Sequence, residues 1–130
     1  MKVVEIIRAA LTRLGVYATG EEVPADDAIG ALAVLNGLLY EYKLQPLIQL
    51  PDALFLPLDI NDDLMVIEEL TRVIVLSLAI DIAPDYGIEP SPSLLRQQSR
   101  AMAVVKRANA KPIYTQSDWC RKSCQKSTYP

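Results

Sequence analysis

The chain has 130 residues, of which 51% are hydrophobic, and it carries a formal net charge of -3 with no histidine. The length favours one domain, and the hydrophobic content excludes disorder throughout the chain. The absence of histidine excludes Ser-His-Asp and Cys-His nucleophilic catalysis and most zinc chemistry, and no apolar run is long enough to cross a bilayer.

The first predicted helix ends at Gly15. Val4, Ile7, Leu11 and Leu14 recur at steps of three and four residues, so they lie on one face of a helix. Gly15 follows the last of them, where helices commonly close in the left-handed conformation that glycine adopts freely.

A second helix is predicted to begin at Pro24, because a proline at the first helical position loses no intrahelical hydrogen bond. Asp26 and Asp27 follow in the first turn, where they complement the positive end of the helix dipole. The buried stripe is predicted to comprise Ala28, Leu32, Leu35, Leu39 and Tyr42, and Ile29, Ala33 and Asn36 widen that stripe or face a neighbour.

Residues 44–60 combine three helix-breaking prolines with many apolar side chains. We expect an extended segment or a loose hairpin here. Two roles stay open: the segment covers the helical core, or it packs against an adjacent subunit. Under the second role, Leu54, Phe55 and Leu56 are candidate residues of an oligomer interface.

A third helix is predicted from an N-cap at Asn61 to about Ala83, where Pro84 stops it. The β-branched residues within it would also suit a strand, but the length and the end signals favour a helix. Its second half is apolar on nearly every side, and a small bundle rarely encloses such a helix completely. We therefore expect an oligomer, with Val75 and Leu78 at the contact between copies.

A fourth helix is predicted from Ser91 and Pro92 to near Ala110. Residues 1–95 hold 15 acids and 5 bases, whereas residues 96–130 hold 1 acid and 8 bases. This asymmetry suggests that the two parts face different surroundings, such as a nucleic acid or an acidic protein surface. The basic face of the fourth helix consists of Arg96, Arg100, Lys106 and Arg107.

Residues 111–130 lack helical periodicity and are predicted to form an extended basic arm outside the helical domain of residues 1–110. Cys120 and Cys124 are expected to be free thiols, because two cysteines do not complete a zinc site. The residues expected to bind a partner are Lys111, Tyr114, Trp119, Arg121, Lys122, Lys126 and Tyr129.

The sequence offers no catalytic, metal-binding or cofactor-binding constellation. Some of its acids occur as adjacent pairs, such as Asp62 and Asp63, but neighbours on a helix diverge by about 100° and form no carboxylate dyad. Two acids from distant segments could still flank a glycosidic bond, so a cell-wall hydrolase stays open as one alternative. A nucleic-acid-binding module that uses the basic C-terminal region is another.

Two stretches resemble one protein family. They are RAALTRLGV, from Arg8 to Val16, and IAPDYGIE, from Ile82 to Glu89. Together they resemble the head-to-tail adaptors of short-tailed bacteriophages, also called tail accessory factors or packaged-DNA stabilisation proteins. The order of the elements between the two stretches is also similar, so the resemblance covers about residues 3–110.

The resemblance implies a virion protein that is not an enzyme and that assembles in the host cytoplasm. It implies a dodecameric ring beneath the portal protein at the head-tail junction. Such a ring continues the DNA channel after packaging, lets double-stranded DNA pass without sequence-specific binding, and offers a platform for tail proteins. In similar members a C-terminal arm extends onto the portal.

Within the second stretch, the residue types at 84–86 indicate a structural corner. Pro84 ends the third helix, Asp85 can accept backbone N–H groups in the turn, and Tyr86 can bury its ring while its hydroxyl reaches a partner. We expect these three residues to set the angle between the third and fourth helices. The fold expected overall is therefore all-α: four main helices with an extended hydrophobic insertion and an extended C-terminal arm.

Overall fold

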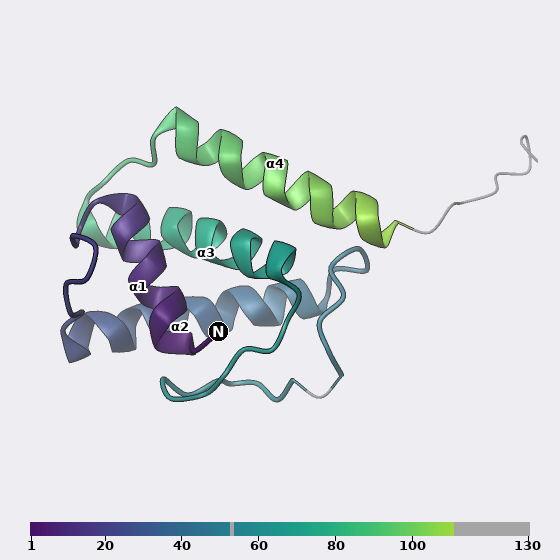
Figure 1. Cartoon of the computed structure of the whole chain (residues 1–130), viewed down its shortest axis with the longest axis horizontal. Coiled ribbons are helices and arrows are strands. Elements are labelled where there is room, and N and C mark those ends of the chain that lie inside the picture. Colours follow the sequence, from purple (N-terminus) through teal and green to yellow (C-terminus); the bar gives the residue numbers. More distant parts are fainter. Residues whose placement is uncertain (53, 111–130) are drawn as a thin grey trace, which may run out of the picture.

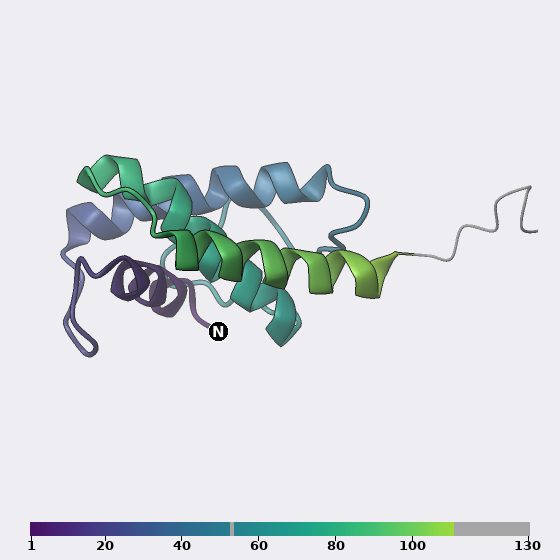
Figure 2. The same ribbon diagram turned by 90° about the horizontal axis from the view of Figure 1, so that it is seen from above.

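Four α-helices pack together in the computed structural model, which describes residues 1–52 and 54–110. They are α1 (Val3–Leu14), α2 (Ala25–Lys43), α3 (Glu68–Ile82) and α4 (Pro92–Asn109), with a short 3-10 helix η1 (Ala83–Tyr86) after α3. Helix α3 lies between α4 and α2, and α1 crosses α2 and α3 (Figures 1 and 2). The described residues form no β-strand, so the all-α prediction is confirmed.

The second half of α3 is enclosed by the other helices of the same chain. Every residue from Val73 to Ala79 is buried, because α1, α2 and α4 each present an apolar stripe to α3. Val75 is 8% exposed and Leu78 is 0% exposed. The inference that an apolar helix in so small a bundle needs a neighbouring copy is therefore wrong for α3, and these two residues form core contacts instead.

The ends of three helices follow their local signals. Gly15 ends α1 with a φ of 80°, and its N–H donates to the carbonyl of Thr12. The hydroxyl of Ser91 caps α4 by accepting the N–H of Leu94 at 3.1 Å. Helix α2 begins directly after Pro24, one residue later than predicted.

Helix α3 begins at Glu68 and not at Asn61 as predicted. The segment before it pairs with the start of the chain: the N–H of Val3 donates to the carbonyl of Asp62 at 3.0 Å, and the N–H of Leu64 donates to the carbonyl of Met1 at 2.9 Å. Backbone groups used in this pairing are not free to form a helical turn.

Burial alternates along the same segment. Leu64 is buried and Val66 is half-buried, whereas Met65 and Ile67 are exposed. This period of two is the pattern of extended backbone and differs from the helical spacing expected of a helix that begins after Asn61. The non-helical insertion between α2 and α3 therefore runs over residues 44–67.

The insertion covers the core, as one of its two predicted roles required. Ile48 and Leu58 are buried, and the side-chain amide of Asn36 on α2 holds both backbone groups of Leu58, at 2.9 and 3.1 Å. Asn36 thus anchors the insertion and does not simply widen the apolar stripe of α2. A hollow of about 640 Å³ is lined by Lys43 at the end of α2 and by residues of the first half of the insertion.

Candidate functional site

The predicted corner at Pro84, Asp85 and Tyr86 forms the 3-10 helix η1 between α3 and α4. Gly87 closes it with a φ of 66°, a left-handed conformation that glycine adopts without strain. The N–H of Gly87 donates to the carbonyl of Pro84 at 3.1 Å. The turn is thus closed by backbone groups, while Asp85 is exposed and Tyr86 is half-buried.

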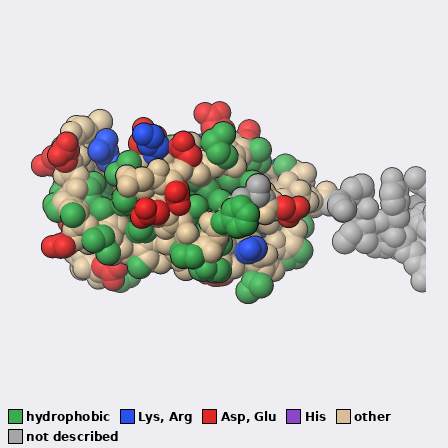
Figure 3. Space-filling view, turned by 90° about the horizontal axis from the view of Figure 1, so that it is seen from below, with side chains coloured by type: hydrophobic (Ala, Val, Ile, Leu, Met, Phe, Trp, Pro, Cys, Tyr) green, Lys and Arg blue, Asp and Glu red, His purple; other side chains and the backbone are tan. Residues whose placement is uncertain are grey.

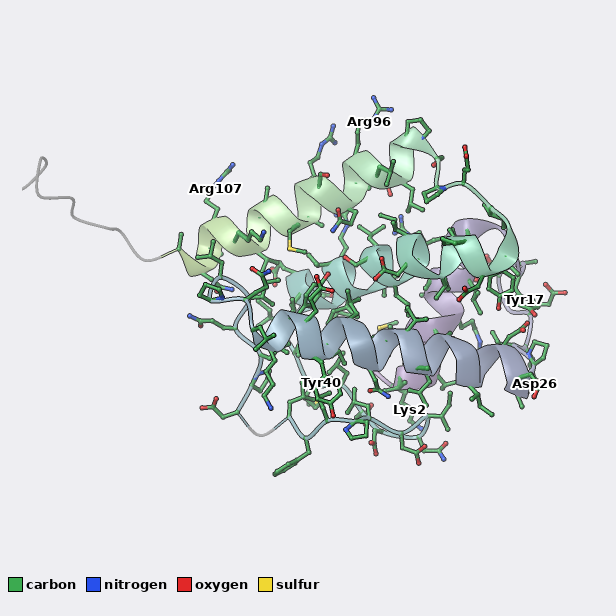
Figure 4. All side chains as sticks on the ribbon, turned by 180° about the vertical axis from the view of Figure 1, so that it is seen from behind. Lys2, Tyr17, Asp26, Tyr40, Arg96 and Arg107 are labelled. Carbon is green, nitrogen blue, oxygen red and sulfur yellow. The ribbon has the colours of Figure 1, made fainter. Side chains whose placement is uncertain are left out.

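Asp27 on α2 joins the corner to the loop that follows α1. The hydroxyl of Tyr17 donates a hydrogen bond to the carboxylate of Asp27, and this bond is the main cause that raises the pKa of Tyr17 to about 12. Burial raises the pKa of Tyr86, and the charge of Asp27 contributes as well. Figure 4 shows Tyr17 and Asp26 at the same end of the molecule. The sequence assigned Asp27 only to the helix dipole and gave no signal for Tyr17.

A polar contact inside the core links three helices. Ser77, the buried hydroxyl of α3, accepts a hydrogen bond from the hydroxyl of Tyr42 on α2 at 2.6 Å and one from the side-chain amide of Gln98 on α4 at 3.1 Å. Because buried polar groups require partners, this contact fixes how α2 and α4 lie against α3. The prediction that Tyr42 is buried is confirmed.

Two acids from different helices lie beside this contact. Glu41 on α2 and Asp81 on α3 line a hollow of about 270 Å³ together with Gln98 and other side chains. Burial raises the pKa of Asp81, and the negative charge of Glu41 raises it further. Sequence reasoning did not pair these two residues, because they are far apart in the chain and neither belongs to an adjacent acid pair.

The residues predicted at an oligomer interface separate into different environments. Leu54 and Leu56 are half-buried and pack against the core, whereas Val75 and Leu78 are buried within it. Phe55 lies between the first two along the chain and is 84% exposed. Of the five, Phe55 alone offers most of its side chain to a partner.

The outer side of α4 carries a row of arginines. Arg96, Arg100 and Arg107, with Val104, are spaced at helical intervals that place them on one side. The stripe that packs against α3, formed by Leu94, Ala101 and Val105, lies on the opposite side of the helix. Figure 4 shows the side chains of Arg96 and Arg107 projecting away from the bundle. We call the exposed residues Arg96, Arg100, Val104 and Arg107 the arginine row.

The insertion presents a second exposed face, of opposite charge. Residues 44–67 contain four aspartates and no base, and Figure 3 shows carboxylates and hydrophobic side chains on this side of the molecule, with some lysine or arginine side chains of other segments among them. Asp59 and Asp62 are joined by a bond of 2.7 Å from the N–H of Asp59 to the carboxylate of Asp62. We call the exposed residues Phe55, Asp59, Asp62, Asp63 and Met65 the insertion face.

The residues predicted to bind a portal lie in 111–130, outside the described residues, and so do Cys120 and Cys124. In the part of the chain that the structure describes, no three acidic or thiol side chains are grouped closely enough to hold a metal ion. None of its helices combines the length and apolar character that crossing a membrane requires.

Comparison with protein-family models and with curated protein sequences adds no relative. No model of a known protein family matches the chain. No curated protein sequence matches it either. A functional proposal therefore rests on the sequence pattern and on the positions of the side chains in the fold. The chain presents two exposed faces of opposite charge, and carboxylates are grouped at two hollows: Glu41 with Asp81 at one, and Asp26 and Asp27 with Asp85 at another.

Proposed function

We propose that the chain is a structural head-to-tail adaptor of a short-tailed bacteriophage, which forms a ring beneath the portal protein. The observation that carries the proposal is the convergence of the two stretches that resemble this family. The first stretch ends at Val16 and leads directly into Tyr17, and the second contains Tyr86. Tyr17 donates a hydrogen bond to Asp27, and Tyr86 lines a hollow of about 170 Å³ together with Asp27.

This convergence gives the resemblance a physical basis. Segments that are about 70 residues apart build one corner, in which a hydrogen bond from Tyr17 to Asp27 joins the loop after α1 to the start of α2. Tyr86, which follows α3, lines the same hollow as Asp27. Such residues hold helices in position, and a protein that assembles into a larger structure requires residues with this role. The same corner contains Pro84 and Gly87, which turn the chain into α4.

The proposed assembly is a dodecamer that continues the DNA channel and offers a platform to tail proteins at the head-tail junction of the virion. Double-stranded DNA passes through it without sequence-specific binding. The basic arm of residues 111–130 contacts the portal, with Trp119 as a main anchor and the lysines and arginines directing the encounter toward an acidic surface.

Electron microscopy of the full chain mixed with rings of the cognate portal protein tests this function. We expect a second ring of density on one end of the portal. A full-length Trp119→Ser variant should bind the portal more weakly, while an Asn61→Ser variant, changed at an exposed site of the insertion, should bind like the wild type. Absence of the wild-type chain from portal rings at low salt would contradict the proposal.

A nucleic-acid-binding module is the second candidate, and the arginine row favours it. Arg96, Arg100 and Arg107 project from one side of α4, and the described part of the chain supplies no ion-pair partner for them. Binding through such a row would weaken steeply with salt, because each phosphate contact releases a counterion. A salt titration of duplex DNA binding by the full chain distinguishes this candidate from the adaptor.

The hydrolase alternative has one supporting observation, the pair of Glu41 and Asp81 at a shared hollow. A carboxylic acid of raised pKa near a second carboxylate is the arrangement of acid-base catalysis in glycoside hydrolases. If this pair were catalytic, the full chain would release soluble fragments from peptidoglycan, and Asp81→Asn would abolish the release. We expect no release by the wild-type chain.

A further inference from the structure

We propose that the arginine row of one copy binds the insertion face of a second copy, so that the chain assembles head to tail through α4 and the insertion. This inference rests on the proposed adaptor function for its biological meaning. Its physical argument rests on the charge, the exposure and the placement of the two faces.

The two faces are complementary in charge. Helix α4 contains Arg96, Arg100, Lys106 and Arg107 and no acid, whereas residues 44–67 contain four aspartates and no base. On the insertion, Asp63 lies 4.0 Å from the N-terminal amine, which offsets part of its charge. Asp59 and Asp62 form no ion pair within the described residues, so they can meet cations of another copy.

Each face also exposes apolar surface beside its charges. Phe55 is 84% exposed and Met65 is 75% exposed on the insertion face, and Val104 is exposed within the arginine row. Arginine together with a large aromatic or methionine side chain is the combination that protein interfaces favour at their centres. An arginine side chain can lie flat on an aromatic ring while its guanidinium reaches a carboxylate.

The two faces lie on opposite sides of the molecule. Figure 1 shows α4 along one side and the later part of the insertion along the other, with α3 and α2 between them, and Figure 2 shows the same elements from above. One copy therefore cannot satisfy both faces by itself. A contact between two different faces on opposite sides leaves one of each face free after pairing, so assembly continues until a ring closes or a filament grows.

A charge-reversal experiment on the full chain tests this pairing. One variant carries Arg96→Glu, Arg100→Glu and Arg107→Glu, which makes the arginine row acidic. A second carries Asp52→Arg, Phe55→Arg, Asp63→Arg and Met65→Arg, which changes the formal charge of residues 44–67 from -4 to +2 without touching the bonded carboxylates of Asp59 and Asp62. Circular dichroism and thermal unfolding establish that both variants keep their helices.

Sedimentation at low salt should show self-association of the wild-type chain, and added salt should weaken it, because exposed charges are screened. Each variant alone should associate at least about tenfold more weakly, since like charges then face one another. An equimolar mixture of the two variants should associate again, because the acidic row of one then meets the basic insertion of the other. Ile29→Arg, an exposed substitution on α2 outside both faces, should associate like the wild type.

Three results would overturn the pairing: a wild-type chain that stays monomeric, single variants that associate normally, or a mixture that remains dissociated. A row variant that loses only duplex DNA binding would overturn it in favour of the nucleic-acid candidate. The adaptor function is tested separately. If both variants still form rings on the portal, the pairing is wrong and the adaptor stands; if the mixture associates but the wild type ignores the portal, the pairing stands and the adaptor is wrong.

Discussion

Helix α3 and the insertion of residues 44–67 are both rich in apolar side chains, yet the fold uses them differently. Every side chain from Val73 to Ala79 is buried, because three helices cover that part of α3. The insertion buries Ile48 and Leu58 but leaves Phe55 in solvent, and residues of its first half line a hollow. Apolar content alone therefore does not distinguish a core segment from an interface segment. The distinction depends on whether other elements of the same chain cover the apolar side chains of the segment.

The largest expected effect is the loss of a side chain from α3. Leu78→Ala removes a fully buried side chain and leaves a cavity, so the free energy of unfolding should fall by about 2–5 kcal/mol. Phe55→Ala removes a larger but exposed side chain and should change it by less than about 0.5 kcal/mol. Urea denaturation of the two variants gives both values. Equal losses would mean that the insertion belongs to the core as fully as α3 does.

A smaller and more local effect is expected where the insertion is anchored. Asn36→Ala leaves the N–H and carbonyl of Leu58 without their partners, which should cost about 1–3 kcal/mol. Hydrogen exchange should become faster around Leu58 and change little within α3. The control is Asn61→Ala, because Asn61 is exposed and its side chain forms no hydrogen bond in the described part of the chain. Faster exchange throughout α3 would show that the insertion and the bundle unfold as one unit.

The sequence predicted the parts of the fold that depend on local signals. Gly15 and Ser91 mark helix ends correctly, and Pro24 does so to within one residue, because each acts on its own backbone. The sequence mispredicted residues 61–67 because their conformation depends on pairing with residues 1–3, which are far away in the chain.

The candidate site was less predictable than the fold. The arginines of α4 were identified because helical periodicity alone places them on one side, whereas Lys106, which was predicted with them, lies off that side and is half-buried. The contacts of Asp27 with Tyr17, of Ser77 with Gln98 and of Glu41 with Asp81 were missed, since each joins different elements and leaves no local pattern. Phe55 was predicted within a wider interface, and only the packing separates it from Leu54 and Leu56.

The smallest effect is expected at Asp81, where α3 meets solvent. It tests whether the sequence of α3 is optimised for stability at this position as well. Burial, followed by the charge of Glu41, raises the pKa of Asp81 above its ordinary value of 3.8, so the folded chain binds this proton more tightly than the unfolded chain. Stability from this group is therefore greatest at low pH, falls as the pH rises from 3.8 through the raised pKa, and is constant above it. Asp81→Asn should remove this decline and raise the free energy of unfolding at neutral pH by about a few tenths of a kcal/mol, because Asp81 is partly exposed and its charge is screened. Glu41→Gln removes only the neighbouring charge and leaves the burial, so its gain should be smaller still.

Urea denaturation at several pH values measures both changes. A loss of stability in Asp81→Asn at neutral pH would show instead that the ionised carboxylate makes a favourable contact at the end of α3.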